Sequence, residues 1–132
     1  MIISREFDYA LRILRHLDKK GMSSAADIER HENVSVDFTR KILRKLKNAG
    51  IVEVERGSKG GYRLVKTCED LTLWDIKHVI DPEEVVNRCV CSSYQCDNID
   101  KNHCSIHHEC LRLESIIRNE MENKKLSEIF GL

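Results

Sequence analysis

The sequence predicts a mainly α-helical fold with one small β-hairpin: a winged helix-turn-helix followed by a long C-terminal helix that we expect to mediate dimerisation. Helical apolar spacing recurs three times before residue 50, and a glycine-rich turn then joins two short strand-like segments. A single apolar stripe follows near the C-terminus. The 132 residues include only six Gly, one Pro and three Phe, a composition that argues against an all-β architecture.

Serines precede each of the first three expected helices, where a hydroxyl can accept a hydrogen bond from the first turn. Ser4 is expected to cap a helix that ends at Gly21, and Ser23 or Ser24 to open a short helix over about 25–31. Ser35 is expected to cap a third helix, which stops at residue 50. The positions of that helix predicted to face the core are Phe38, Ile42, Leu43, Leu46 and Ala49.

The second half of the chain divides into shorter elements. Strands are expected at 51–55 and 62–66, and a capping box of Thr72 with Asp75 predicts a helix to about Ile80. Residues 87–104 lack periodicity and are expected to form a loop, whereas apolar spacings of four, three, four and four predict a helix from Ser105 to about Lys125. We therefore expect a winged helix-turn-helix domain at 1–82, a cysteine-rich loop at 83–104, and a dimerisation helix with its tail at 105–132; the charges and cysteines considered next lead us to expect DNA binding by the first and cluster binding by the second.

Charge is distributed unevenly along a chain whose net charge is zero. Residues 1–66 carry a net +6 and residues 67–132 a net −6, which suggests a basic working surface in the first half. No apolar run is long enough to span a bilayer, and the first residues lack the apolar region of a secretory signal, so we expect a cytoplasmic protein that does not contact a membrane. No nucleophile–base arrangement or phosphate-binding loop is evident, so we expect neither an enzyme nor a small-molecule substrate.

The third expected helix and the hairpin carry most of the positive charge. Residues 35–66 hold nine basic and three acidic side chains, which favours a nucleic-acid surface over an ordinary solvated helix face. In a winged helix-turn-helix the third helix enters the major groove of double-stranded DNA, and two copies bind a pseudo-palindromic operator. The candidate DNA-binding residues are Ser35, Asp37, Thr39, Arg40, Lys41, Arg44, Arg56, Ser58, Lys59, Gly60 and Tyr62.

Five of the six cysteines lie between residues 89 and 110, which in a cytoplasmic chain favours metal or redox chemistry over structural disulfides. Cys89, Cys96 and Cys104 are separated by six and seven residues, and His107 follows Cys104 by three. Thiolates with an imidazole suit an iron–sulfur cluster or zinc. The wide, irregular spacing favours an iron–sulfur cluster, with zinc and unligated redox thiols as alternatives.

Several stretches resemble the Rrf family of bacterial winged-helix regulators, which includes the IscR and NsrR types. They are residues 34–52, the wing at 56–64, and the segments at 8–12 and 71–76. The resemblance covers essentially the whole chain. It implies a homodimeric DNA-binding transcription regulator, expected to act as a repressor, with a cluster-binding loop between the winged-helix domain and the dimerisation helix.

The resemblance also implies ligands for the cluster. Members of the IscR type bind [2Fe-2S] through three cysteines and a histidine three residues after the last of them, positions that correspond to Cys89, Cys96, Cys104 and His107. Members of the NsrR type hold [4Fe-4S] with three cysteines and an aspartate from the partner subunit, a position that corresponds to Asp8. We expect [2Fe-2S] ahead of [4Fe-4S], with the fourth ligand left open.

The sequence departs from the family pattern in ways that leave alternatives. The intervals between the cysteines are longer than usual, Cys91 competes with Cys89 as first ligand, and Cys110 is an additional thiol. The base-contact positions differ in charge, so the operator sequence is not implied. A cluster-free regulator that responds through thiol oxidation or a partner protein is one alternative function, and a small electron-transfer iron–sulfur protein is another.

Overall fold

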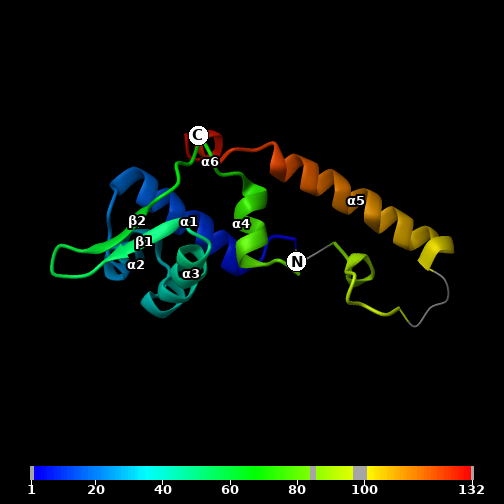
Figure 1. The fold of residues 1–132 in the computed structure, drawn as a ribbon, viewed down its shortest axis with the longest axis horizontal. Helices are drawn as coiled ribbons and strands as arrows, with labels where there is room; N and C mark the ends of the chain where they lie inside the picture. Colours follow the sequence, from blue (N-terminus) through cyan, green and yellow to red (C-terminus); the bar gives the residue numbers. More distant parts are fainter. Residues whose placement is uncertain (1, 84–85, 97–100, 132) are drawn as a thin grey trace.

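The computed structural model describes residues 2–83, 86–96 and 101–131 and confirms the expected fold class, a mainly helical chain with one two-stranded hairpin (Figure 1). No helix within these ranges is both long and apolar enough to cross a bilayer. The elements in chain order are α1 (Arg5–Lys20), α2 (Ala25–Glu32), α3 (Val36–Asn48), β1 (Val52–Glu55), β2 (Gly61–Leu64), α4 (Leu73–Ile80), the 3₁₀ turns η1 (Arg88–Val90) and η2 (Lys101–His103), α5 (Ser105–Glu122) and α6 (Leu126–Phe130).

The caps that begin the helices are largely those predicted. Ser4 Oγ accepts from the Phe7 amide at 3.0 Å, and Ser35 Oγ accepts from the first turn of α3. Ser24, not Ser23, caps α2, where it forms a capping box with Asp27. Because each cap satisfies amides that the first turn leaves unpaired, these helix starts can be located from sequence alone.

The core lies where α1 packs against α2, α3, α4 and the wing. On α3 the fully buried positions are Thr39, Ile42, Leu43 and Leu46, a stripe with helical spacing. The expectation that Phe38 and Ala49 face the core is wrong: Phe38 is 41% exposed and Ala49 is exposed at the end of the helix. Phe38 lies one residue off the buried stripe and packs edge-on against Tyr9, with ring centroids 5.7 Å apart.

The wing is an antiparallel pair, β1 with β2, in which Val54 faces Tyr62. It is joined to the helix-turn-helix by a two-way backbone bridge: the Ser23 amide donates to the Tyr62 carbonyl at 3.0 Å, and the Tyr62 amide donates to the Ser23 carbonyl at 2.8 Å. A Cβ at Gly61 would lie 2.7 Å from the Ser23 carbonyl oxygen, so this approach requires glycine. The orientation of the wing is thereby fixed relative to α2.

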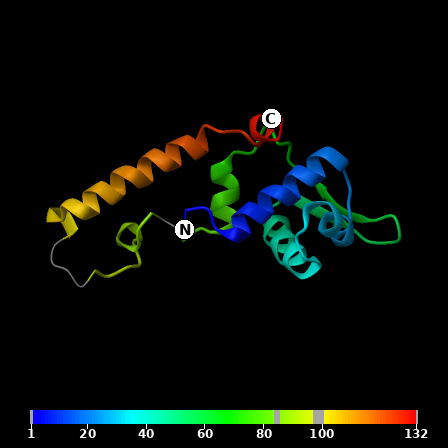
Figure 2. The same ribbon diagram turned by 180° about the vertical axis from the view of Figure 1, so that it is seen from behind.

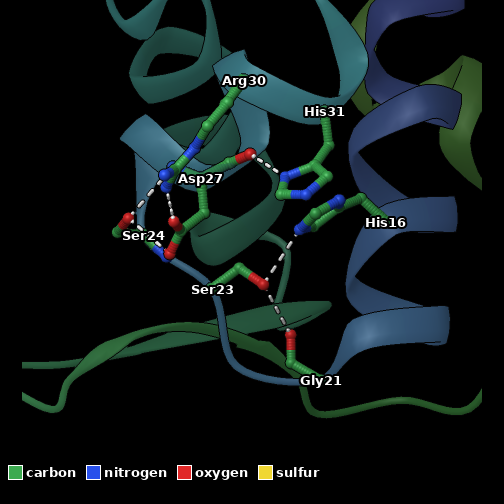
Figure 3. A network of polar contacts seen from close by, with 7 residues as sticks. All are labelled: His16, Gly21, Ser23, Ser24, Asp27, Arg30 and His31. Atoms are coloured by element: carbon green, nitrogen blue, oxygen red, sulfur yellow. Dashed lines mark hydrogen bonds and ion pairs between the residues drawn. The ribbon is translucent and has the colours of Figure 1, made fainter.

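A buried histidine, His16, contacts the side chain of Ser23, one of the two residues of this bridge (Figure 3). His16 Nε2 is 3.0 Å from Ser23 Oγ, whose own proton is directed to the Gly21 carbonyl at 3.1 Å, so the neutral ring donates from Nε2. Its Nδ1 faces a Glu32 carboxylate oxygen 4.0 Å away. Burial lowers the pKa of His16 from its ordinary value, against the opposing effect of Glu32; the other charged or titratable neighbours are His31, Asp27 and Lys20.

Helix α5 leaves the winged-helix domain and extends away from it, as both views of the ribbon show (Figures 1 and 2). It ends at Glu122, slightly earlier than expected, and is followed by α6, which the sequence did not predict. Leu126 is fully buried and Phe130 nearly so, both in the core of the winged-helix domain. The Leu126 amide donates to the Leu71 carbonyl at 2.9 Å, so the C-terminal turn fastens the base of α5 to that domain.

Candidate functional site

The outer face of α3 presents exposed cations beside the wing. Arg40, Arg44 and Lys47 line a small hollow of about 180 Å³ together with Leu43, Val54 and Tyr62. None of these three cations is in an ion pair with any residue that the structure describes. Unpaired cations flanking a groove between helix and wing are suited to neutralise phosphates.

Lys47 belongs to this hollow but is absent from the candidates that the sequence supplied. Lys47 could have been found from its spacing, because residues 40, 44 and 47 follow one another at intervals of four and three and therefore share a helix face. The expected set was chosen from the first turns of the helix, where side chains reach base edges. The hollow beside the wing extends the basic face toward the end of α3.

Two other lysines on α3 contact groups of the protein itself. Lys45 Nζ lies 2.9 Å from a Glu6 carboxylate oxygen and donates to the Ile80 carbonyl at 3.1 Å. Lys41 Nζ lies 3.7 Å from the same Glu6 oxygen and over the Phe38 ring, 5.7 Å from its centroid. Lys41, a candidate for DNA contact, is therefore at the edge of the basic face with part of its charge already compensated.

Thr39 must be removed from the candidate DNA-binding residues. Its side chain is fully buried, and its hydroxyl donates to the Val34 carbonyl at 3.2 Å. A β-branched side chain with a satisfied hydroxyl packs in a core almost like valine, which the sequence pattern did not distinguish from a polar surface position. Asp37 and Ser35 are exposed in the first turn, where Ser35 also caps the helix.

The tip of the wing is the second basic feature. Arg56, Ser58 and Lys59 are exposed there. A Cβ at Gly60 would lie 2.0 Å from the Glu55 carbonyl oxygen, so the turn needs glycine at this position. The structure thus brings the expected wing residues together at the loop that projects between β1 and β2 (Figure 1).

The expected loop at 83–104, of which the structure describes 83, 86–96 and 101–104, is called the cysteine segment below. It folds back along α5. The Val86 amide donates to a Glu114 carboxylate oxygen at 2.8 Å, and η1 packs against the same helix. Cys110 lies on α5 one turn before Glu114, and the effect of this hydrogen-bonding neighbour is among the causes that act on the pKa of Cys89. Partial burial, this neighbour and the proximity of Cys104 and Cys96 raise the pKa of the Cys89 thiol above its ordinary value. Cys96, Cys104 and Cys110 are therefore close enough to influence the titration of Cys89.

The remaining candidate ligands occupy different surroundings. Cys91 Sγ is 3.0 Å from Ser93 Oγ. His107 Nδ1 is buried with no hydrogen-bond partner among the described residues, a costly state for a ring nitrogen unless something binds it. Asp8 is paired with Arg12 at 2.9 Å, one turn along α1. Cys68, outside the segment, is buried in the winged-helix core.

The thiols are gathered but not arranged as a closed site. Within 2–83, 86–96 and 101–131, no three Cys, His, Asp or Glu side chains are placed so that they could hold a metal ion. The chemistry of the donors nevertheless fits an iron–sulfur cluster, because several thiols and an unpartnered imidazole nitrogen lie on one segment and the helix it contacts.

The cysteine segment begins at a point tied to both α1 and α3. Asp81, which follows α4, accepts a hydrogen bond from the Ser4 hydroxyl at the start of α1, and its carbonyl accepts from Lys77 at 3.2 Å. Next to it, the Ile80 carbonyl accepts from Lys45 of α3. The beginning of the segment is thus connected by side-chain hydrogen bonds to the helix that carries the basic face.

Comparison with known proteins places the chain among transcription regulators. Residues 3–131 match the model of the Rrf2 family, described as iron-dependent transcriptional regulators. A putative HTH-type transcriptional regulator of Aquifex aeolicus is 24% identical over 100% of this chain and 93% of its own length. The HTH-type transcriptional regulator NsrR of Bacillus licheniformis is 31% identical over 83% of this chain and 74% of its own length.

Solved structures share the fold. CymR, the global cysteine regulator of B. subtilis, superposes with a TM-score of 0.76 at 23% identity, covering 98% of this chain and 95% of that one. IscR of T. potens superposes with a TM-score of 0.73 at 20% identity, covering 98% of this chain and 85% of that one. Together with the family match, which spans nearly the whole sequence, these findings show that the chain belongs to the Rrf2 family of DNA-binding transcription regulators, which are not enzymes.

Proposed function

We propose that this protein is a cytoplasmic homodimeric regulator that binds a pseudo-palindromic operator and senses redox, nitric oxide or iron–sulfur status through a bound iron–sulfur cluster. The observation that carries the proposal is that the turn bearing Cys89 packs against α5, the helix that starts after Cys104 and bears Cys110 and the buried, unpartnered Nδ1 of His107. The family's description as iron-dependent supports a metal-based signal.

Operator binding uses the basic face of α3 and the wing tip. Arg40 and Arg44, with Lys47 behind them, are free to contact phosphates and base edges, and Arg56 with Lys59 reach the flanking backbone or minor groove. Asp37 lies exposed in the first turn of α3, where a carboxylate can accept a hydrogen bond from a cytosine amino group.

Dimerisation uses α5, whose apolar residues are unusually exposed. Ile106 is 68% exposed and Ile116 46%, with Leu113 between them on the same side of the helix. A helix about 27 Å long that projects from a small domain with such a stripe is suited to pair with the same helix of a second copy. The pair would set the spacing of the two α3 helices on DNA.

The cluster would be held by Cys89, Cys96, Cys104 and His107. Cys110 competes with His107 for the fourth position, since it lies on the helix against which the turn of Cys89 packs. The alternatives for single positions are Cys91 for Cys89 and Asp8 of the partner subunit for His107. We favour [2Fe-2S], which the imidazole nitrogen suits. A bound cluster supplies a centre that oxygen or nitric oxide destroys and that iron shortage withholds.

The chain's own contacts couple this segment to DNA binding. The segment begins beside Asp81 and Ile80, which Ser4 and Lys45 connect to α1 and α3. Binding of the cluster by the thiols would order the segment. Loss of the cluster would release the segment and so alter the contacts made by Ser4 and Lys45 and the relative pose of the two α3 helices. The effect is a population shift between two arrangements with different operator affinities.

The test is anaerobic purification with measurement of visible absorption, iron and sulfide. Wild-type protein is expected to hold iron and sulfide, Cys89→Ser and Cys104→Ser to lose both, and Cys68→Ser, altered in the winged-helix core, to retain them. Mössbauer spectra of His107→Ala, Cys110→Ser and Asp8→Ala then identify the fourth ligand. A colourless wild-type protein without iron, even after reconstitution, contradicts the cluster.

Operator affinity of the loaded and cluster-free forms decides whether the cluster is the signal. The proposal requires the two forms to differ. Equal affinity, or control by thiol oxidation alone in protein that never binds iron, favours the cluster-free regulator. The electron-transfer interpretation is set aside, because it gives no role to the unpaired cations of α3 and the wing.

A further inference from the structure

Phe38 is an exposed aromatic side chain on the helix that carries the basic face. It is the third residue of α3 and is 41% exposed. Its neighbours in the first two turns, Asp37, Arg40 and Lys41, are exposed as well. In a helix-turn-helix, the N-terminal residues of this helix contact base edges in the major groove. An apolar surface therefore lies where bases are read.

The ring of Phe38 is held in place by its neighbours. Tyr9 of α1, which packs against the core, meets it at an interplanar angle of 83°, with ring centroids 5.7 Å apart. Lys41 Nζ lies over the same ring, 5.7 Å from its centroid. A side chain that is already held loses little conformational freedom when a ligand covers it. Phe38 thus differs from a scattered apolar residue that is free to rotate on the surface.

Cations flank this apolar surface. On the side of α1, the Arg12 guanidinium lies over the Tyr9 ring, 5.6 Å from its centroid, and Lys41 lies over Phe38. Further around the helix are the unpaired cations beside the wing. Double-stranded DNA has the complementary arrangement, with base edges between two rows of phosphates. The apolar group that a base presents in the major groove is the C5 methyl group of thymine, so a thymine is the partner that fits Phe38.

We propose that Phe38 recognises a thymine in each half of the operator by packing its ring against the C5 methyl group. The inference rests on the operator binding in the proposed function and adds a base preference to it. Contacts of the cations with phosphates carry no sequence information directly. Tyr9 is a positioning residue, since it acts by holding the ring of Phe38.

The size of the effect follows from the group that is removed. Replacing thymine by deoxyuridine deletes the methyl group and leaves every hydrogen-bonding group of the base in place. Burial of one such group contributes about fourfold to affinity. A homodimer makes the contact twice, so replacement in both half-sites should cost about fifteenfold.

The test uses the full-length protein and a duplex that wild type selects from a random library. Each thymine is replaced by deoxyuridine together with its symmetry mate, and affinities are measured by fluorescence anisotropy at fixed salt. We expect one pair of positions at which wild type loses about fifteenfold, whereas Phe38→Ala binds both duplexes equally and Phe38→Leu, still apolar, discriminates in part. Absence of a responsive pair, or an undiminished loss for Phe38→Ala, overturns the proposal.

Two controls separate base reading from other effects. Arg44→Gln should weaken binding to both duplexes and leave the ratio of their affinities unchanged, since Arg44 is expected to contact phosphates. Tyr9→Ala should lower the ratio, and Tyr9→Phe, which keeps the ring, should restore it. An unchanged ratio in Tyr9→Ala overturns the positioning role.

Photocross-linking gives an independent reading. Iododeoxyuridine at the responsive pair carries iodine in place of the methyl group, and light should join it to the tryptic peptide 31–40, which contains Phe38, in wild type but not in Phe38→Leu. A cross-link to other peptides only overturns the contact. Wild type that selects a duplex but is indifferent to deoxyuridine contradicts this inference alone, whereas protein that selects no duplex contradicts the operator binding of the proposed function and the inference with it.

Discussion

Replacing Arg44 tests whether the unpaired cations beside the wing contact DNA phosphates. Arg44 is exposed, lines the hollow between α3 and the wing, and is in no ion pair with any described residue. Each neutralised phosphate contributes about 0.9 to the slope of log affinity against log salt. A dimer uses the residue twice, so Arg44→Gln should reduce the slope by about 2.

The decrease in slope predicts how much operator affinity each protein loses as salt is raised. Between about 50 and 200 mM salt, a slope smaller by about 2 means that the variant loses about tenfold less affinity than wild type. Fluorescence anisotropy of a labelled duplex over this salt range provides the slope. Thermal unfolding checks that the variant is folded.

Lys45→Gln is the matched control on the same helix. Lys45 carries the same charge one position further along, but its ammonium group is held by Glu6 and the Ile80 carbonyl. Its slope should stay close to that of wild type. An unchanged slope for Arg44→Gln, or an equal decrease for Lys45→Gln, would refute the argument that ion pairing inside the protein separates DNA-contacting cations from structural ones.

Three further predictions concern the stability and reactivity of the winged-helix domain. Because burial lowers the pKa of His16, the unfolded chain binds more protons, so thermal stability should fall as pH drops from about 7.5 through the unfolded value of 6.5; His16→Gln should flatten this dependence in calorimetry. Leu126→Ala should lower the free energy of unfolding by about 2–5 kcal/mol in urea titrations, because this fully buried side chain anchors α6. Cys68, with its pKa raised to about 12, should resist iodoacetamide at pH 8 in folded protein while the exposed Cys96 is alkylated, as peptide mass spectrometry would show.

Helices and turns that are fixed by residues close to one another in the sequence could be predicted from the sequence. The starts of α1, α3 and α4 follow from Ser4, Ser35 and the Thr72–Asp75 capping box, because these side chains bond to amides within their own first turn. The wing was predictable because its turn needs glycine at a fixed position. These features depend on neighbours in the sequence and little on the rest of the fold.

Elements that depend on distant contacts were missed. Helix α6 has five residues, too few to be stable alone, and exists because Leu126 enters a core built by other helices. Thr39 was assigned to the surface because it is polar, whereas the Val34 carbonyl allows its hydroxyl to be buried. The contact of Val86 with Glu114 is likewise not predictable from spacing, since it requires the segment to turn back along α5.

The contacts of Lys45 on α3 suggest how the cysteine segment could influence the DNA-binding helix. Glu6 and the Ile80 carbonyl both bind Lys45, so this lysine joins α1, α3 and the start of the cysteine segment at one point. Ser4 and Asp81 form a second connection between the start of α1 and the same place. A signal from the thiols therefore need not cross the hydrophobic core, which resists deformation. If the cluster binds as proposed, its signal would reach α3 through a few exposed or partly buried polar contacts, whose net free energies are small enough for gain or loss of the cluster to reverse them.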